Sequence, residues 1–292
     1  MIKQRSTPNP SDFNFRLFLD EFDDLCVTRA PFGKASAVYK VRAGESTYYL
    51  KFLNAFSRRE FDVYAAHSHD ATHLPKLLNL QFGIEAGDVL LMEDVSVGRS
   101  HPDSKMLAKN ATRILTAVSE VGQPLVSQIP QKSLQTTFKS RLAGDIEKMA
   151  IENAHFSGSL QTLRNQVTAW IGERLSGFFS DEQISFIHGN LNPGNILLGD
   201  YDVKLIDFEN YDVGIPLEDL VNLAFFFPPD EKFQLLADDR SRAIALMYLD
   251  KILTFYATST DPTANMAAID RFRQDYMSLA HLVLPSTSSF TF

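Results

Sequence analysis

Residues 186–209 read FIHGNLNPGNILLGDYDVKLIDFE, and this stretch decides the fold. Its first part, His-Gly-Asn-Leu-Asn-Pro-Gly-Asn, is rich in glycine, proline and short polar residues, so we expect a tight loop there. Residues 196–198 and 203–206 are apolar runs on either side of a Gly-Asp turn signal, and we predict that they form a strand hairpin. The second strand would carry Asp207 back toward the loop that contains Asn195.

An asparagine and an aspartate that a hairpin brings together can bind a metal ion. Carboxylate and amide oxygens are ligands for Mg²⁺, which proteins usually bind together with the phosphate oxygens of a nucleotide. We therefore predict a metal site formed by Asn195 and Asp207. Taken singly, Asp207 is typical of a turn and Asn195 of a loop, so this interpretation depends on the motifs around them.

Those motifs resemble the pattern of the aminoglycoside phosphotransferase and choline kinase family, relatives of the protein kinases. The family pattern is His-Gly-Asp-x4-Asn, then Ile-Asp-(Phe or Trp)-(Glu or Asp), then Gly-x-Pro-x2-Asp-Leu. In this chain the three blocks occur in that order at residues 188–195, 206–209 and 214–220. The resemblance covers about residues 25–227. It implies an α+β, bilobal protein-kinase-like fold with a small β-rich N-lobe and a larger helical C-lobe.

The patterns along the chain agree with that layout. We expect an N-terminal arm and helix at residues 1–23, a nucleotide-binding N-lobe at 24–94, and a C-lobe at 95–292 that holds the catalytic loop, the metal site and the acceptor pocket. Apolar periodicity predicts the individual elements. The predicted strands are residues 37–41, 47–52 and 89–92, and the predicted helices are residues 57–67, 105–121 (ending at Gly122), 160–175, 241–256 and 264–284.

The resemblance also implies roles for residues of the N-lobe. Lys51 would bind the phosphates of ATP, and Glu60, on the next predicted helix, would hold Lys51. Gly33 and Ser36 would lie in the loop that covers the phosphates. The implied cofactors are ATP and Mg²⁺. The segment whose backbone would bind adenine contains Met92, Glu93 and Asp94.

One position departs from the family pattern. The family has a catalytic aspartate that accepts the proton of the substrate hydroxyl, whereas this chain has Asn190 there, in a loop that His188 would support. An amide is no base at neutral pH, and general-base catalysis is typically worth ~10²–10⁴-fold. Four explanations remain open: an acceptor that is already deprotonated, another carboxylate such as Glu209 or Asp212 acting as base, a pseudokinase, or a deliberate aspartate-to-asparagine substitution made to trap a complex.

We expect an enzyme that transfers the γ-phosphoryl group of ATP to an alcohol- or amine-bearing metabolite or antibiotic, with Asn190 and His188 at its catalytic loop. The alternative is a nucleotide-binding pseudokinase that acts as a regulatory or interaction module. Retention of both predicted metal ligands favours the enzyme. Only six residues separate Asp207 from Gly214, too few for the activation loop of a protein kinase.

Charge and composition exclude several other classes. The 292 residues carry 36 acidic and 28 basic side chains, and the net charge of −8 argues against nucleic acid as a partner. Residues 181–239 carry 13 acidic and two basic groups, which would suit a cationic small-molecule acceptor. No apolar run approaches the ~18 residues that span a bilayer, so we expect no membrane partner. With Cys26 as its single cysteine the chain forms no internal disulfide, and we expect a cytoplasmic protein.

Overall fold

The computed structural model describes residues 25–29, 37–53, 57–67, 72–78, 89–151, 158–179, 183–257 and 266–284. The predicted arm at residues 1–23 and the predicted phosphate-loop residues Gly33 and Ser36 lie outside the described residues. The described residues form two compact units. One contains those up to Gln128 together with His188–Asp212, and the other contains Ile129–Ile187 together with those from Val213 onward. The lobe boundary at residue 94 follows the family layout and stays a prediction.

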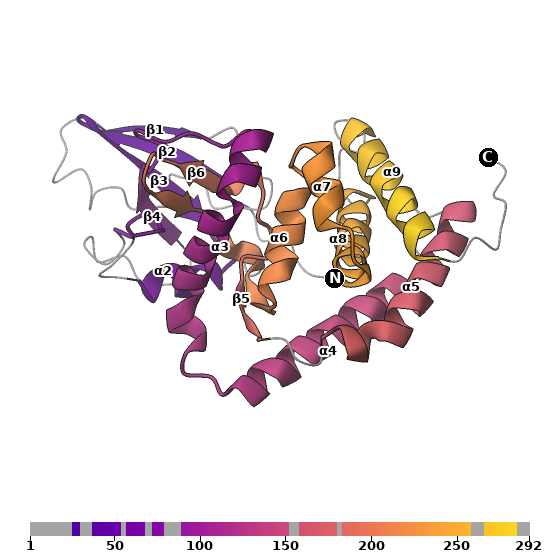
Figure 1. The fold of residues 1–292 in the computed structure, drawn as a ribbon. Coiled ribbons are helices and arrows are strands. Elements are labelled where there is room, and N and C mark those ends of the chain that lie inside the picture. The colour runs from indigo at the N-terminus through magenta and orange to yellow at the C-terminus, as the bar shows by residue number, and fades with distance from the viewer. Residues whose placement is uncertain are drawn as a thin grey trace, which may run out of the picture. The chain divides into compact units, whose positions relative to one another are not determined.

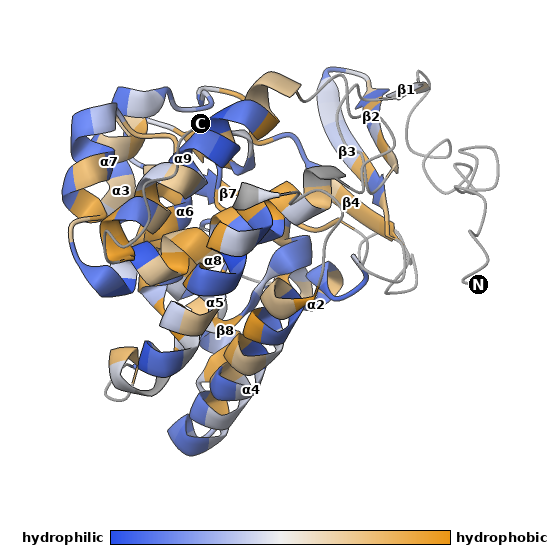
Figure 2. Cartoon of the chain, turned by 90° about the vertical axis from the view of Figure 1, so that its right-hand side faces the viewer, coloured by the Kyte–Doolittle hydropathy of each residue, from blue (hydrophilic) through white to orange (hydrophobic). Residues whose placement is uncertain are grey.

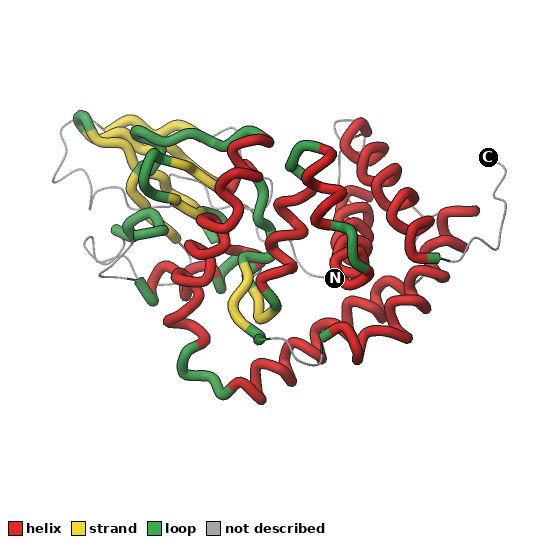
Figure 3. The backbone as a smooth tube through the Cα atoms, viewed as in Figure 1, coloured by secondary structure: helices red, strands yellow, loops and turns green. Residues whose placement is uncertain are grey.

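The first unit contains a four-stranded antiparallel sheet in the order β1-β2-β3-β4 (Figures 1 and 3). In β2, alternate residues are buried, which is the period-2 pattern of a strand with one face on the core. In β4, four apolar residues precede Glu93 (Figure 2). The three predicted strands are confirmed. The observed bounds are β1 Leu25–Arg29, β2 Ala37–Ala43, β3 Ser46–Phe52 and β4 Val89–Glu93.

The same unit contains the predicted hairpin. Its strands β6 and β7 pair antiparallel in the register Ile196↔Leu205, and every residue of both strands is buried. β7 packs against helix α3. Asp103 caps that helix by accepting a hydrogen bond from the backbone N–H of Met106 (2.8 Å). The remaining elements of this unit are α2 Glu60–Ala65, α3 Ser104–Val126, η2 Pro193–Asn195, β6 Ile196–Leu198, β7 Val203–Leu205 and η3 Phe208–Asn210.

The predicted end of α3 at Gly122 is wrong. The helix continues to Val126 and includes both Gly122 and Pro124. Gly122 is buried next to Val121 and one turn from Val118, so it lies on the packed face of the helix. Glycine costs a helix roughly 1 kcal/mol relative to alanine, and burial of the neighbouring valines is sufficient to offset that amount.

The second unit is mainly helical. Strands β5 and β8 form a short two-stranded sheet. Helix α6 begins at Pro216, and proline fits this first position because the N–H that it lacks would have no partner within the helix. The predicted helices at 160–175, 241–256 and 264–284 are confirmed, whereas α4, α6 and α7 lie outside the predicted helices. The bounds are α4 Gln131–Ala150, α5 Ser159–Phe178, β5 Ser185–Ile187, β8 Asp212–Gly214, α6 Pro216–Ala224, α7 Pro229–Leu235, α8 Asp239–Ala257 and α9 Met266–Val283.

Ion pairs connect several elements of this second unit, among them Lys232 on α7 with Asp275 on α9 (2.9 Å). Arg164 on α5 binds Asp250 on α8 with both side chains buried (Nε to Oδ1, 2.6 Å). Arg141 on α4 donates from Nη2 to both carboxylate oxygens of Glu218 (2.7 Å each) and from Nε to the carbonyl of Val213 (3.1 Å). In the part of the chain that the structure describes, no helix combines the length and the apolar character needed to cross a bilayer.

Candidate functional site

Three charged side chains of the first unit meet at its centre. The Nζ atom of Lys51 lies 2.6 Å from Oε2 of Glu60 and 2.5 Å from Oδ1 of Asp207. Lys51 comes from β3, Glu60 is the first residue of α2, and Asp207 follows β7. Lys51 and Glu60 are almost completely buried, whereas the Asp207 side chain is one-third exposed. The predicted pair of Lys51 and Glu60 is thus present, and Asp207 joins it.

This cluster has more negative than positive charge. Burial alone would lower the pKa of Lys51, but the carboxylates of Glu60 and Asp207 outweigh it and the pKa is raised, so the ammonium stays charged. Burial raises the pKa of Glu60 to about 7, although Lys51 acts in the opposite sense. Burial, and then the charge of Asp207, also raise the pKa of the nearby Glu209 carboxyl. Carboxylates that share one ammonium group favour an additional cation beside them.

Asp207 has an unusual backbone conformation. Its φ of 66° and ψ of 59° lie in the left-handed region, and it is the one non-glycine residue with positive φ in the described part of the chain. Such conformations persist where the surroundings fix them, and they occur often at functional sites. Here the next residue, Phe208, donates its backbone N–H to Oε1 of Glu60 (3.2 Å) and buries its ring against Tyr64 and His188.

The loop before the hairpin is fixed by its own polar groups. His188 is fully buried and donates from Nε2 to the carbonyl of Ile206 (3.0 Å), and burial lowers its pKa to about 4, so the ring is neutral at pH 7. Asn195 donates from Nδ2 to the carbonyl of Asn190 (2.9 Å). This contact uses the amide nitrogen of Asn195, and the atom that would bind a cation is its Oδ1. Ile206 donates its N–H to the carbonyl of Asn195 (3.1 Å), which holds the two ends of the hairpin together.

A cavity of about 390 Å³ opens beside the cluster. Its lining combines polar groups, the three charged residues described above and Asn195, with apolar side chains that include Val38, Leu197 and Ile206. The predicted adenine-binding segment lies on the same cavity, since Met92, Glu93 and Asp94 line it. Asn190 is not among the lining residues. The cavity therefore combines most of the predicted site residues that the structure describes.

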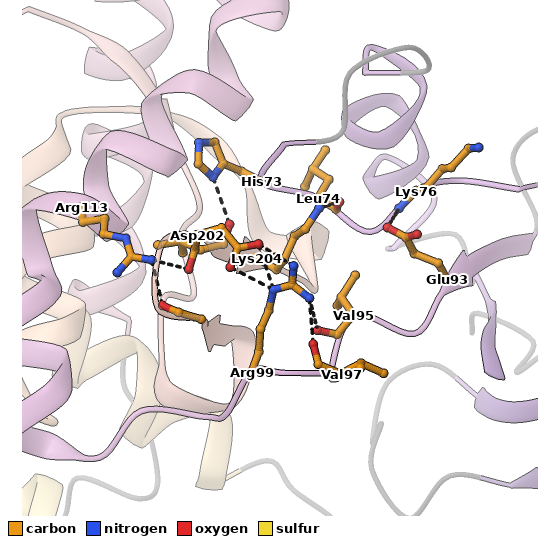
Figure 4. Close-up of polar contacts among 12 residues, drawn as sticks. His73, Leu74, Lys76, Glu93, Val95, Val97, Arg99, Arg113, Asp202 and Lys204 are labelled. Atoms are coloured by element: carbon orange, nitrogen blue, oxygen red, sulfur yellow. Dashed lines mark hydrogen bonds and ion pairs between the residues drawn. The ribbon is translucent and has the colours of Figure 1, made fainter. Parts of the chain in front are cut away.

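An unpredicted polar network fixes the turn of the hairpin (Figure 4). Arg99, in the segment between β4 and α3, forms an ion pair with Asp202 and donates from Nη1 to the carbonyls of Val95 (3.1 Å) and Val97 (3.2 Å). Arg113 of α3 donates from Nη2 to the carbonyl of Asp202. Long arginine side chains follow no periodic pattern, so these contacts have no signature in the sequence. They attach the segment after Met92 to the hairpin that carries Asp207.

The chain is similar to known phosphotransferases in sequence and in fold. A model of the phosphotransferase enzyme family, APH, matches residues 20–245. Among solved structures, a thermostable mutant of aminoglycoside phosphotransferase APH(4)-Ia aligns with a TM-score of 0.62 at 14% identity, covering 91% of this chain and 98% of that one. Choline kinase LicA from Streptococcus pneumoniae gives 0.58 at 14%, covering 90% and 98%. Macrolide 2'-phosphotransferase MphH from Brachybacterium faecium gives 0.54 at 15%, covering 96% and 100%.

None of the curated protein sequences matches the chain. The structural likenesses, all at low identity, concern the fold. They confirm the α+β, bilobal kinase-like architecture and the resemblance to aminoglycoside phosphotransferases and choline kinases that the sequence motifs indicated.

Proposed function

Because the chain belongs to the phosphotransferase enzyme family, we propose that it uses Mg²⁺ and ATP to phosphorylate a small molecule that bears an alcohol or amine group. The observation that carries the proposal is the cavity on which Lys51, Glu60, Asp207 and Asn195 meet. A structure of APH(4)-Ia in this fold contains ADP and hygromycin B, which supports a nucleotide and a small-molecule acceptor here as well.

The residues fit a magnesium ion bound together with phosphates. Asp207 supplies one carboxylate and Asn195 one amide oxygen, and Mg²⁺ in nucleotide enzymes usually takes one or two protein ligands and completes its shell with phosphate and water. Among the described residues there is no cluster of three histidine, cysteine or acidic side chains that would form an all-protein metal cage. When bound, the ion neutralises charge on the transferred phosphoryl group.

The protein's own groups would then position the nucleotide. Lys51 would exchange its contact with Asp207 for the phosphates while Glu60 keeps holding it, as in the kinase layout. The segment from Met92 to Asp94 would bind the base between the apolar walls formed by Val38 and Leu197.

Asn190 decides how well such a site would turn over. Its carbonyl accepts hydrogen bonds from Asn192 and Asn195, and its side-chain amide has no basic atom at neutral pH. We therefore expect slow phosphoryl transfer to a neutral alcohol. A nucleotide-binding pseudokinase is the second candidate function, and the missing carboxylate at this position is the observation that favours it.

The first test is nucleotide binding with and without metal. We expect the full chain to be stabilised by AMP-PNP in the presence of Mg²⁺, by roughly 3 kcal/mol at 100 times the Kd. Asp207→Asn should remove the metal dependence while leaving the fold intact, because asparagine tolerates the left-handed backbone better than other residues. The matched control is Asp62→Asn, an exposed acid on α2. If AMP-PNP gives the wild-type chain no stabilisation, both the enzyme and the pseudokinase are ruled out.

The second test separates those two candidates. ATP hydrolysis is compared between the wild-type chain and Asn190→Asp. A gain of ~10² or more would identify position 190 as a disabled base. A substantial rate that does not change would show that catalysis proceeds without a base there, and absence of turnover in both chains would favour the pseudokinase.

A further inference from the structure

Helix α2 is too short to hold its own position. It has six residues, and no side chain caps its N-terminus. Helices this short are unstable in isolation, so contacts with neighbouring elements must fix where α2 begins. That beginning matters, because its first residue is Glu60, whose carboxylate binds Lys51.

Arg59, the residue before the helix, makes one such contact. Its Nη2 atom donates to the backbone carbonyl of Tyr211 (2.5 Å). Its guanidinium carbon lies 4.2 Å from the centre of the Tyr211 ring, in cation–π geometry. A guanidinium can make both contacts at once because it is flat and carries several donors.

Arg59 and Glu60 together hold both ends of one short turn. The 3₁₀ turn η3 spans Phe208–Asn210. Glu60 accepts the backbone N–H of Phe208 at its start, and Arg59 binds the carbonyl of Tyr211 immediately after its end. The residue just before this turn is Asp207, in its left-handed conformation.

We propose that Arg59 and Tyr211 are positioning residues that fix η3 against α2 and thereby hold the carboxylate of Asp207 where it can bind the metal ion. This inference rests on the proposed function, since it assigns a partner to the predicted metal ligand. We refer to the pair as the Arg59–Tyr211 clamp. Neither residue lines the cavity, so the clamp acts on the nucleotide only through Asp207 and Glu60.

Because Arg59 is exposed, an effect on the metal site can be distinguished experimentally from an effect on the stability of the fold. Its contact with Tyr211 lies at the surface, and loss of an exposed side chain changes the stability of a fold little. A partner that orients a metal ligand, by contrast, typically changes metal affinity 10–100-fold when removed. Metal-dependent binding should therefore respond to the clamp, and thermal stability should not.

The test measures the Kd of AMP-PNP by calorimetry in excess Mg²⁺ and again in EDTA, using the full chain. The ratio of the Kd in EDTA to the Kd in Mg²⁺ measures how much the metal site strengthens nucleotide binding. We expect Arg59→Ala and Tyr211→Ala to reduce this ratio about tenfold while the Kd in EDTA stays within about twofold. Tyr211→Phe keeps the ring and the carbonyl and should behave as wild type, and Arg59→Lys should lie between, since it keeps the charge and one donor without the flat surface.

Arg42→Ala is the matched control, because Arg42 is an exposed arginine on β2 of the same unit and does not line the cavity. An unchanged ratio in Arg59→Ala would overturn the clamp. So would an equal loss of affinity in Mg²⁺ and EDTA together with a lower melting temperature, since that pattern marks a purely structural contact. If the wild-type chain binds AMP-PNP equally well with and without Mg²⁺, or not at all, the proposed metal–nucleotide site itself fails and the clamp fails with it.

Discussion

Replacing Gly189 with alanine tests how closely the loop at residues 188–195 approaches the backbone of Asn210. Gly189 has φ of 75°, and a Cβ atom there would lie 2.2 Å from the backbone oxygen of Asn210. The left-handed conformation costs a residue with a side chain roughly 1–2 kcal/mol. Relief of the clash requires a backbone shift, and forced overpacking adds typically 1–3 kcal/mol. We therefore expect Gly189→Ala to lower the free energy of unfolding by about 2–5 kcal/mol.

Substitutions at two other glycines separate the cost of the backbone conformation from the cost of the steric clash. Gly44 also has positive φ (58°), but a Cβ there would meet nothing within 4 Å, so Gly44→Ala should cost only the conformational part, about 1–2 kcal/mol. Gly144 lies inside helix α4 with open space around it, and Gly144→Ala should stabilise the chain by about 0.5–1 kcal/mol. The same substitution thus has three different expected effects.

Urea denaturation of the three variants and the wild type measures these values directly. The difference between Gly189→Ala and Gly44→Ala gives the cost of the contact with Asn210. A Gly189→Ala variant no less stable than Gly44→Ala would refute the close approach and with it the described geometry of the loop at residues 188–195. We also expect Gly189→Ala to weaken AMP-PNP binding, because the shift displaces Asn190 and the proposed metal ligand Asn195 that donates to it.

Two further predictions concern buried charge. Burial lowers the pKa of His188 to about 4, so below pH 6.5 the unfolded chain binds a proton on this ring that the folded chain does not. The free energy of unfolding should therefore fall by about 3 kcal/mol between pH 6.5 and pH 4 because of His188. His188→Gln should flatten that part of the stability profile in urea titrations, and identical profiles would argue against a buried neutral imidazole. Arg141→Met leaves the largely buried Glu218 without its arginine partner and should cost about 3 kcal/mol, whereas the double variant with Glu218→Gln should recover part of the loss. Thermal melts of the two single variants and the double variant measure this coupling, and strictly additive losses would contradict it.

Sequence motifs predicted much of the centre of the first unit. The hairpin at residues 196–206 was predicted from two apolar runs and a turn signal, and its strands were found at those positions. The meeting of Lys51 with Glu60 was expected from the kinase layout and has the geometry of an ion pair. These residues were predictable because motif spacing and strand alternation both depend on local chain geometry. Their roles toward ATP and Mg²⁺ remain predictions.

Other features depend on contacts between distant segments and left no local pattern. The extension of α3 past Gly122 results from burial of that face of the helix, which outweighs the low helix propensity of glycine. The contacts of Arg59 with Tyr211 and of Arg99 with Asp202 join residues more than 100 positions apart. Helix α4 is different: Leu134, Phe138 and Leu142 recur every four residues and are buried, so this helix does have a local signal in the sequence.

The division of the first unit into two chain segments has a consequence for synthesis on the ribosome. The strands β6 and β7 and the loop before them belong to the same unit as the sheet, yet they are made only after residues 129–187 of the second unit. Until then α3 lacks the strand β7 that packs on it, and the emerging chain carries exposed apolar surface. A fragment that ends at Gln128 would lack Asp207 and the hairpin, so we expect it to aggregate rather than to fold. Assembly of the first unit therefore requires closure of a long loop, and we expect this to slow folding and to prolong the exposure of apolar surface.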